Sequence, residues 1–506
     1  TLRILNGGKV TSNDATLGFF GGSSGTATID GAGSNWTANG AISVGGSGAG
    51  TLTITNGATV QDAGGYIAGG ASPGDVTVSG AGSSWINTSL VVGINGPASL
   101  TIADGGTVSA GTATLASTAS SSGTLNIGAA AGSAAAGAGR LDAAALQFGA
   151  GAGTIVFNHT DANYSFDAAL SGSGTINQLA GNTTLTADSS TFAGAANVLG
   201  GRLAVNGSLA NTSVAVSGTG ILGGSGRVGA VDVQAGGTVA PGNSIGTLNV
   251  GSITFAVGST YQVEVNAAGQ GDRIVAAGLA TLNGGTVGVL AGAGNYPLST
   301  RYTILTANGG VSGQFAAVTS NFAFLTPALS YDATNAYVTL DRTAAPPDPS
   351  VPEKPQPIAF ASVAATRNQA ATAGAVESLG SGSVFDAVLF QSAEGARAAF
   401  DALSGEIHAS AKGVLVEEGA ALRDAATGRL RSAFGAVGAA QMATMNYGFT
   451  ADLAPSATGP MPKLRSDRFA LWGQGYGSWG RSESDRNAGK LTRSSGGLMV
   501  GGDVAV

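Results

Sequence analysis

One serine lies in a pattern associated with nucleophilic catalysis. Residues 242–246 read GNSIG, which matches the G-x-S-x-G sequence that exposes a nucleophilic serine on a sharp strand-to-helix turn. The surrounding sequence is rich in glycine and resembles strands, with no helical pattern after the serine. In a chain with 85 glycines, such matches arise by chance. We therefore expect that Ser244 is not catalytic.

The two histidines are the other candidates for chemistry. His159 lies two residues before Asp161, and this spacing would suit a pair of metal ligands, but it is more typical of a solvated surface loop. His408 follows Glu406 in the run LSGEIHAS, far along the chain from Ser244. There is no cysteine, so thiol catalysis, disulfides and thiolate metal sites are excluded. The sequence predicts no catalytic residue, no cofactor and no metal site.

The overall composition narrows the functional class. The net charge of −7 leaves no basic surface for a nucleic acid. Hydrophobic residues make up 43% of the 506 residues, so an intrinsically disordered chain is not expected. No run of 18 apolar residues is present, and the sequence therefore predicts no transmembrane helix.

Charge is distributed unevenly and divides the chain into two parts. Residues 1–343 contain 8 basic and 14 acidic side chains, whereas residues 344–506 contain 14 and 15 in less than half the length. Between them, residues 344–357 (AAPPDPSVPEKPQP) include six of the 14 prolines. Proline blocks both helices and sheet ladders, so this segment is expected to be an extended linker.

The N-terminal part is built from repeats. Residues 1–10 (TLRILNGGKV), 51–60 (TLTITNGATV) and 99–108 (SLTIADGGTV) align with one another at a nearly constant spacing. A second element, GAGSNW or GAGSSW, places Trp36 and Trp85 at the same position of successive repeats. Short alternating strands at a fixed period, separated by Gly, Asn and Asp turns, favour a solenoid.

The predicted solenoid is a right-handed parallel β-helix with roughly 24 residues per turn. Stacked strands lie about 4.8 Å apart, so such a rod would be on the order of 70 Å long. Trp36 and Trp85 could bind a ligand, but a tryptophan that recurs in one repeat position is more typical of the core. Residues 200–343 contain more aromatic residues, and we expect this region to be the most stable part and to template the folding of the weaker repeats.

Several long phrases resemble a known protein family. GGTVAPGNSIGTLNV (236–250), YQVEVNAAGQGDRI (261–274) and RYTILTANGGVSGQF (301–315) are similar to the C-terminal part of bacterial autotransporter passengers. ARAAFDALSGEIHAS (396–410) and RFALWGQGYGSWGR (468–481) resemble the linker helix and the first barrel strand of that family. The resemblance implies type V secretion by a 12-stranded barrel, with a structural role for Glu406 and His408 in the linker or pore.

On this basis the chain is expected to contain six segments. They are a repeat β-solenoid (1–128), a less regular β-solenoid (129–199), an autochaperone-like end of the passenger (200–343), the proline-rich linker (344–357), a helical linker region (358–466) and the first two strands of an incomplete barrel (467–506).

The hydrophobic periodicity and the charge of the last two segments agree with the resemblance. Residues 406–434 have apolar residues near a period of 3.6 together with many charges, and 29 helical residues span about 44 Å, more than the roughly 30 Å of a bilayer core. Such a helix could thread a barrel or pack on its neighbours. SGGLMVGGDVAV (495–506) alternates as an outer-membrane strand does, and Trp472, Tyr476 and Trp479 could form part of an aromatic girdle. Two strands leave open edges, so we expect the chain to be a fragment.

The leading hypothesis is a self-secreting, non-enzymatic protein of a Gram-negative outer membrane, whose passenger is displayed at the cell surface as a stalk or adhesin. Its expected partners are the outer membrane, the barrel-assembly machinery and a host or bacterial surface ligand, with a monomeric passenger. One alternative is a structural repeat protein of a surface layer or matrix. Another is the stalk of an enzyme whose catalytic domain lies upstream of Thr1.

Overall fold

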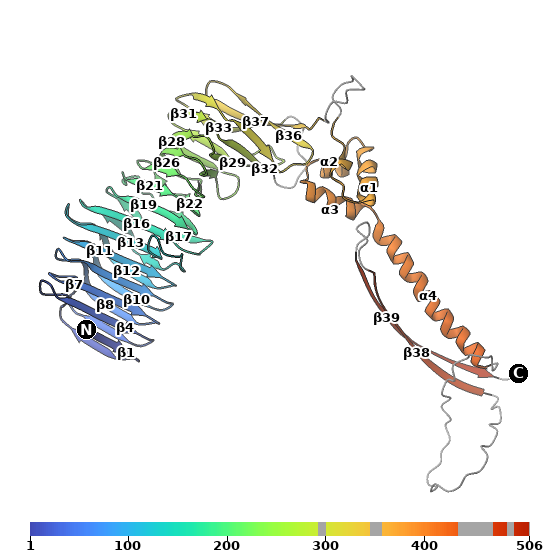
Figure 1. Ribbon diagram of the computed structural model, residues 1–506, viewed down its shortest axis with the longest axis horizontal. Helices are drawn as coiled ribbons and strands as arrows, with labels where there is room; N and C mark the ends of the chain where they lie inside the picture. Colours follow the sequence, from blue (N-terminus) through green and yellow to red (C-terminus); the bar gives the residue numbers. More distant parts are fainter. Residues whose placement is uncertain (292–299, 345–356, 434–468, 483–489, 505–506) are drawn as a thin grey trace, which may run out of the picture. The chain divides into compact units, whose positions relative to one another are not determined.

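The computed structural model describes residues 1–291, 300–344, 357–433, 469–482 and 490–504. The chain separates into two compact units, Thr1–Pro357 and Ile358–Val506. The first unit is a β-solenoid, whose strands stack coil upon coil from the N-terminus onwards (Figure 1). The second unit contains helices and one strand pair.

Three sheets form the walls of the solenoid. The first sheet runs along the whole unit and has 19 strands: β1 (Leu2–Leu5), β4 (Ser24–Asp30), β7 (Ala49–Thr55), β9 (Gly74–Ser79), β11 (Pro97–Ala103), β13 (Ser122–Gly128), β16 (Ala152–Asn158), β19 (Thr175–Ala180), β21 (Ala195–Val198), β23 (Ser208–Leu209), β24 (Ser213–Val216), β26 (Arg227–Val233), β28 (Thr247–Phe255), β30 (Arg273–Ala276), β31 (Ala280–Asn283), β33 (Arg301–Ala307), β34 (Val311–Gln314), β36 (Leu325–Tyr331) and β37 (Asn335–Arg342).

The other two sheets succeed each other along the unit. The second sheet has ten strands: β2 (Lys9–Ser12), β3 (Ala15–Leu17), β5 (Asn35–Ala38), β6 (Ala41–Val44), β8 (Thr59–Ile67), β10 (Ser84–Val92), β12 (Thr107–Leu115), β14 (Arg140–Asp142), β15 (Ala145–Phe148) and β18 (Ala169–Ser171). The third has eight: β17 (Tyr164–Phe166), β20 (Asn182–Leu185), β22 (Arg202–Val205), β25 (Ile221–Gly224), β27 (Thr238–Pro241), β29 (Thr260–Val265), β32 (Thr286–Ala291) and β35 (Ala317–Ser320).

Alternation along each strand builds the core. In β7, Leu52 and Ile54 have no exposed surface, whereas Thr51, Thr53 and Thr55, which alternate with them, face outward. In the neighbouring coils, Leu52 lies between Ala27 and Val76, and Ile54 lies between Ile29 and Val78. Each aliphatic side chain thus stacks on its counterparts one coil before and after. The predicted parallel β-solenoid is confirmed.

The coil length follows the prediction only in the repeats. Leu2 pairs with Ala27, and Gly50 pairs with Gly74, so the repeat coils have the expected length. Farther along, Ala195 pairs with Ser213, and the step between paired positions is clearly shorter. A uniform coil length is therefore wrong for the middle of the unit.

A recurring turn explains the Asn-Gly and Asp-Gly pairs of the repeats. Asn6, Asn56 and Asp104 occupy equivalent positions and have φ values of 56°, 55° and 49°. The glycine after each has a φ near 80°. Consecutive positive φ angles are tolerated by Asn or Asp followed by Gly, which is why the repeats share this pair.

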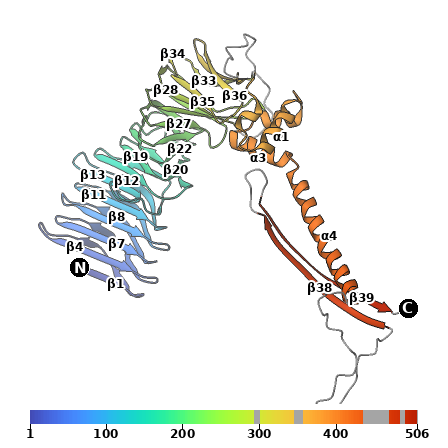
Figure 2. The same ribbon diagram turned by 45° about the vertical axis from the view of Figure 1, so that its right-hand side comes forward.

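An antiparallel hairpin closes the C-terminal end of the solenoid. β36 and β37 pair with each other, and β37 pairs antiparallel with β33. These are the antiparallel pairs between strands of this unit in the part of the chain that the structure describes. Their inward residues, including Leu325, Val338 and Leu340, are buried. In this hairpin, β37 covers the backbone edge that β33 would otherwise present to solvent (Figures 1 and 2).

The second unit begins with a small helical cluster. It comprises the 3-10 helix η1 (Phe360–Val363), α1 (Arg367–Glu377), α2 (Ser383–Leu389) and α3 (Ala393–Leu403). Phe360, Phe385, Phe390 and Phe400 are buried between them. Most of the proline-rich linker, residues 345–356, lies outside the described residues.

One long helix and one strand pair complete the second unit. The helix predicted over 406–434 is confirmed as α4 (Glu406–Ala433), despite its three glycines. β38 (Phe469–Ser482) pairs antiparallel with β39 (Leu491–Val504), and both contact α4. Among the described residues, no helix is both long enough and apolar enough to cross a membrane.

The strand pair corrects one prediction. One face of the strand pair carries four exposed apolar side chains: Leu471, Trp479, Leu498 and Val500. The residues between them along each strand point to the opposite face. Trp472 and Trp479 are separated by an odd number of positions, so they lie on opposite faces and cannot share one aromatic girdle. The side chain of Tyr476 lies outside the described residues.

Candidate functional site

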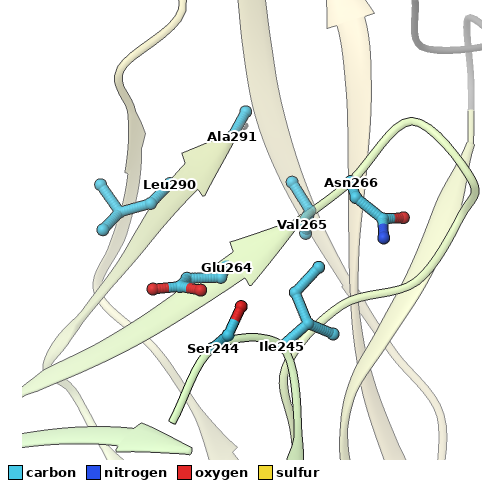
Figure 3. A pocket seen from close by; sticks show the side chains of 7 residues that line it. All are labelled: Ser244, Ile245, Glu264, Val265, Asn266, Leu290 and Ala291. Carbon is cyan, nitrogen blue, oxygen red and sulfur yellow. The ribbon is translucent and has the colours of Figure 1, made fainter. Parts of the chain in front are cut away.

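The GNSIG segment forms a tight turn between β27 and β28. Ser244 and Ile245 line a hollow of about 310 Å³, together with Glu264, Val265 and Asn266 and with Leu290 and Ala291 of the adjacent strand (Figure 3). No helix follows the serine, because residues 247–255 continue directly as strand β28. The turn therefore lacks the geometry of a nucleophile elbow.

His159, the histidine of the solenoid unit, is too far from Ser244 to act as its base. His159 follows β16, and the first sheet places β19, β21, β24 and β26 between β16 and β28. Five strand steps correspond to about 24 Å. His408 belongs to the second unit. Within the solenoid unit, Ser244 therefore has no histidine base.

A buried carboxylate holds the turn instead. Asp272 is only 1% exposed, and its two oxygens accept hydrogen bonds from the backbone N–H groups of Gly246 and Glu264, both at 2.8 Å. The guanidinium of Arg202 donates to the carbonyl of Gly242 at 2.5 Å. Burial raises the pKa of Asp272 to about 6, and the two N–H donors partly oppose that rise. The GNSIG turn and the GDRI segment that contains Asp272 thus have a structural role.

These contacts predict a small loss of stability for one substitution in this region and a large loss for another. Ser244→Ala should change the free energy of unfolding by less than about 0.5 kcal/mol, as expected for a surface side chain. Asp272→Ala should destabilise the chain by about 2–4 kcal/mol, because it leaves two buried N–H groups without acceptors. Urea unfolding of both variants would measure the difference. A loss of stability in Ser244→Ala that equals the loss in Asp272→Ala would contradict this assignment.

His159 is not in a solvated loop, and that prediction is wrong. Its side chain has no exposed surface, and its ring lies 5.1 Å from the ring of Tyr164. Nδ1 accepts from the backbone N–H of Asp161 at 3.2 Å, and Nε2 is 2.8 Å from the hydroxyl of Thr183. Nε2 therefore carries the proton in the neutral ring. Burial lowers the pKa of His159, which favours this neutral form.

The repeated tryptophans are core residues, as predicted. Trp36 is 2% exposed and Trp85 is fully buried. Each indole N–H donates to a polar side chain one coil earlier: Trp36 to Ser12 at 3.2 Å, and Trp85 to Asp62 at 2.7 Å. The tryptophan position in the repeat therefore requires a polar partner in the preceding coil.

Sequence reasoning missed Asp62 and Asn87. Both are buried, and they face each other across β8 and β10. The signal was present, because Asp62 lies two positions after the inward-facing Val60 and must share its face.

The linker residues Glu406 and His408 lie in the first turn of α4. The carboxylate of Glu406 accepts a hydrogen bond from the hydroxyl of Ser410, and the backbone N–H of His408 donates to Gly405 at 2.9 Å. Residues two apart on a helix do not face each other, so the two side chains form no pair. Within the described ranges, no group of three or more His, Asp or Glu residues could hold a metal ion.

Several known proteins are similar in sequence to this chain over long stretches. No family model matches the chain. An extracellular serine protease of Serratia marcescens is 30% identical over 400 residues, which cover 68% of this chain and 35% of that protein. The adhesin BmaC autotransporter of Brucella suis is 35% identical over 300 residues, covering 46% of this chain and 9% of the adhesin. An uncharacterized lipoprotein of Escherichia coli, YdeK, is 41% identical over 138 residues, or 26% of this chain.

The matches therefore extend over much of this chain but over about a third or less of the two longer-matching relatives. Together with the parallel solenoid and its antiparallel cap, they show that the chain is homologous to autotransporter proteins and contains a β-solenoid of the kind that forms their passenger region.

Proposed function

We propose that this chain is the passenger and the membrane-proximal part of a self-secreting protein of the Gram-negative outer membrane. The observation that carries the proposal is the order of elements: a capped solenoid, a helical segment and then two long antiparallel strands. The passenger lies at the cell surface, and the strands belong to the membrane-embedded part.

The dimensions of the last elements support this reading. β38 and β39 have 14 residues each, whereas a strand needs about 9–11 residues to cross a bilayer. Leu471, Leu498 and Val500, on the face that would contact lipid, are 68–73% exposed. α4 has 28 residues and a length of about 42 Å, so it could extend through a pore that crosses the membrane.

The passenger itself acts as a stalk or an adhesin without enzymatic activity. The hollow beside Ser244 contains no histidine, and the exposed faces of the repeats present mainly short polar side chains, such as Thr28, Thr53 and Thr77. The proposed partners are the barrel-assembly machinery and a ligand on another cell surface, and the passenger is proposed to be monomeric. No cofactor is required.

Protease treatment of intact cells that carry the full-length gene tests the route of export. The expected result is removal of the passenger from the surface and retention of a protected membrane fragment that begins near residues 344–357. Cells treated after outer-membrane permeabilisation control for access. A passenger that is cut only after permeabilisation would overturn self-secretion and favour a structural repeat protein elsewhere in the envelope.

An enzyme-bearing passenger is the second candidate, because one relative is named an extracellular serine protease. The match covers 35% of that protein, so its activity is not transferred to this chain. A fluorophosphonate probe that labels active serine hydrolases should leave the protein expressed from the full-length gene unlabelled. Labelling of a part upstream of Thr1 would establish the enzymatic alternative, whereas labelling that disappears in Ser244→Ala would place the activity in the GNSIG turn.

A further inference from the structure

Two buried oxygen atoms without a hydrogen-bond partner lie at directly paired positions of the solenoid core. They are Oδ1 of Asp62 and Oδ1 of Asn87. The side chains are 5% and 6% exposed, and the two residues are directly paired in the register of β8 and β10. An acceptor without a donor in the core destabilises the folded state, so two adjacent ones call for an explanation.

The remaining polar atoms of this pair are already engaged. Oδ2 of Asp62 accepts from the indole N–H of Trp85 at 2.7 Å, and Nδ2 of Asn87 donates to the carbonyl of Ser109 at 3.3 Å. One hydrogen atom between the two free oxygens would satisfy both of them. An ionised Asp62 cannot supply it, whereas a protonated carboxyl can.

We propose that the folded solenoid binds one proton at Asp62, held between its Oδ1 and the Oδ1 of Asn87. The site is a buried carboxylic acid that donates to an amide oxygen within a coil of the passenger. Folding at neutral pH then takes up this proton from solvent, because aspartate in an unfolded chain has a pKa of about 3.9 and is ionised there.

No cation is placed to hold Asp62 in its charged form. The nearby strands of the second sheet, β5, β6, β10 and β12, contain no charged or titratable side chain. In the facing wall, β4 and β9 contain Asp30 and Asp75, and the alternation of those strands points both outward. Burial raises the pKa of Asp62 to about 7, and the bond from Trp85 only partly opposes it.

A side chain on the neighbouring Gly65 could in principle supply a donor to the pair, but there is no space for one. A Cβ built on Gly65 would lie 2.0 Å from Oδ1 of Asn87 and 2.6 Å from the ring of Trp85. A side chain at this position would therefore displace the pair. The absence of a side chain at Gly65 gives Asp62 and Asn87 the space that they occupy. A proton on Asp62 would then provide the missing hydrogen bond between them.

The sign of the effect is the reverse of ordinary acid denaturation. The folded state binds a proton that the unfolded state lacks between pH values of about 4 and 7. The stability from this site is present at low pH and is lost as the pH rises through about 7. In that window, one proton changes the unfolding equilibrium constant by up to about tenfold per pH unit.

Infrared spectroscopy of the folded 506-residue chain tests the proton directly. At pH 6, the wild-type spectrum minus the Asp62→Asn spectrum should contain a carbonyl band of a protonated carboxyl, and this difference band should fade as the pH rises through about 7. Taking the difference removes the contribution of Asp272, whose pKa burial raises to about 6. Asp232→Asn is the matched control, because Asp232 lies on an outward, exposed position of strand β26. A difference spectrum without this band at pH 6 would overturn the proposal.

Asn87→Ala separates the proposal from its closest competitor, an Asn87 amide turned so that Nδ2 donates to an ionised Asp62. Loss of an acceptor for the proton should move the titration of Asp62 to lower pH, whereas loss of a donor to the carboxylate would move it to higher pH. Urea unfolding adds a second readout. Asp62→Asn should flatten the dependence of the midpoint on pH and should fold at pH 8, since its amide oxygen can still accept from Trp85. Failure of this variant to fold would contradict the proposal.

Discussion

Deletion of the β36–β37 hairpin, residues 325–342, from the full-length protein is expected to leave the surface passenger sensitive to external protease. The hairpin buries Leu325, Val338 and Leu340, and β37 covers the backbone edge of β33. Without it, these apolar contacts are lost and the last parallel coil has an open edge. The loss should propagate, since each coil of a solenoid is stabilised by its neighbours.

A second deletion of the same length provides the control. Residues 195–212 make up one of the shorter coils, because Ala195 is in register with Ser213 and Asn182 is in register with Arg202, which itself pairs with Ile221. Removing this coil should let β19 pair with β24 and leave the cap in place. We expect this shorter passenger to remain protease-resistant.

Limited proteolysis on intact cells, read by band intensity over time, measures both variants. The hairpin deletion should shorten the half-life of the passenger by at least about tenfold, which corresponds to about 1.4 kcal/mol where cleavage follows the open population. Equal resistance of the two deletions would show that the hairpin has no special role. It would also count against the predicted autochaperone-like role of residues 200–343.

The aromatic cluster beneath the cap is expected to give the largest effect of a single substitution. Tyr261 is fully buried, its ring centroid lies 5.6 Å from Phe255 and 6.1 Å from Phe315, and its hydroxyl donates to the carbonyl of Ile304. Tyr261→Ala should lower the free energy of unfolding by about 3–5 kcal/mol, as removal of large core aromatics does.

Two further variants separate packing from hydrogen bonding. Tyr261→Phe keeps the ring and leaves one buried carbonyl unpaired, so it should cost only about 1–3 kcal/mol. Tyr66→Ala removes a partly exposed tyrosine on the outer face of β8 and should cost less than Tyr261→Ala. Urea unfolding followed by circular dichroism would rank the three. A loss in Tyr66→Ala as large as that in Tyr261→Ala would contradict the assignment of the core.

The local pattern of the chain was sufficient for the class of fold. Strands such as Ala49–Thr55 alternate small or aliphatic residues with threonine, and the Asn-Gly and Asp-Gly pairs recur at matching positions. These are short-range features, since alternation and turn type depend on residues within one coil. For the same reason, the helix Glu406–Ala433 could be predicted from its periodicity.

The positions of the polar core residues needed the tertiary structure. His159 looked like a loop residue beside Asp161, yet it is enclosed by Thr183 and Tyr164 from later in the chain. Asp62 became significant only because stacking placed it beside Asn87 and Trp85. Which side chains meet is decided by the register between coils, and no single repeat contains that information.

The lengths of the coils and the end of the solenoid were likewise settled by packing. The step between paired residues is shorter at Ala195 and Ser213 than at Leu2 and Ala27, and regular repeats are no longer visible in the sequence there. The strands Leu325–Tyr331 and Asn335–Arg342 alternate much as the others do, yet they run antiparallel and close the stack. Alternation shows which residues face inward, but the direction of a strand depends on which backbone edge is left to pair with, and only the folded stack determines that.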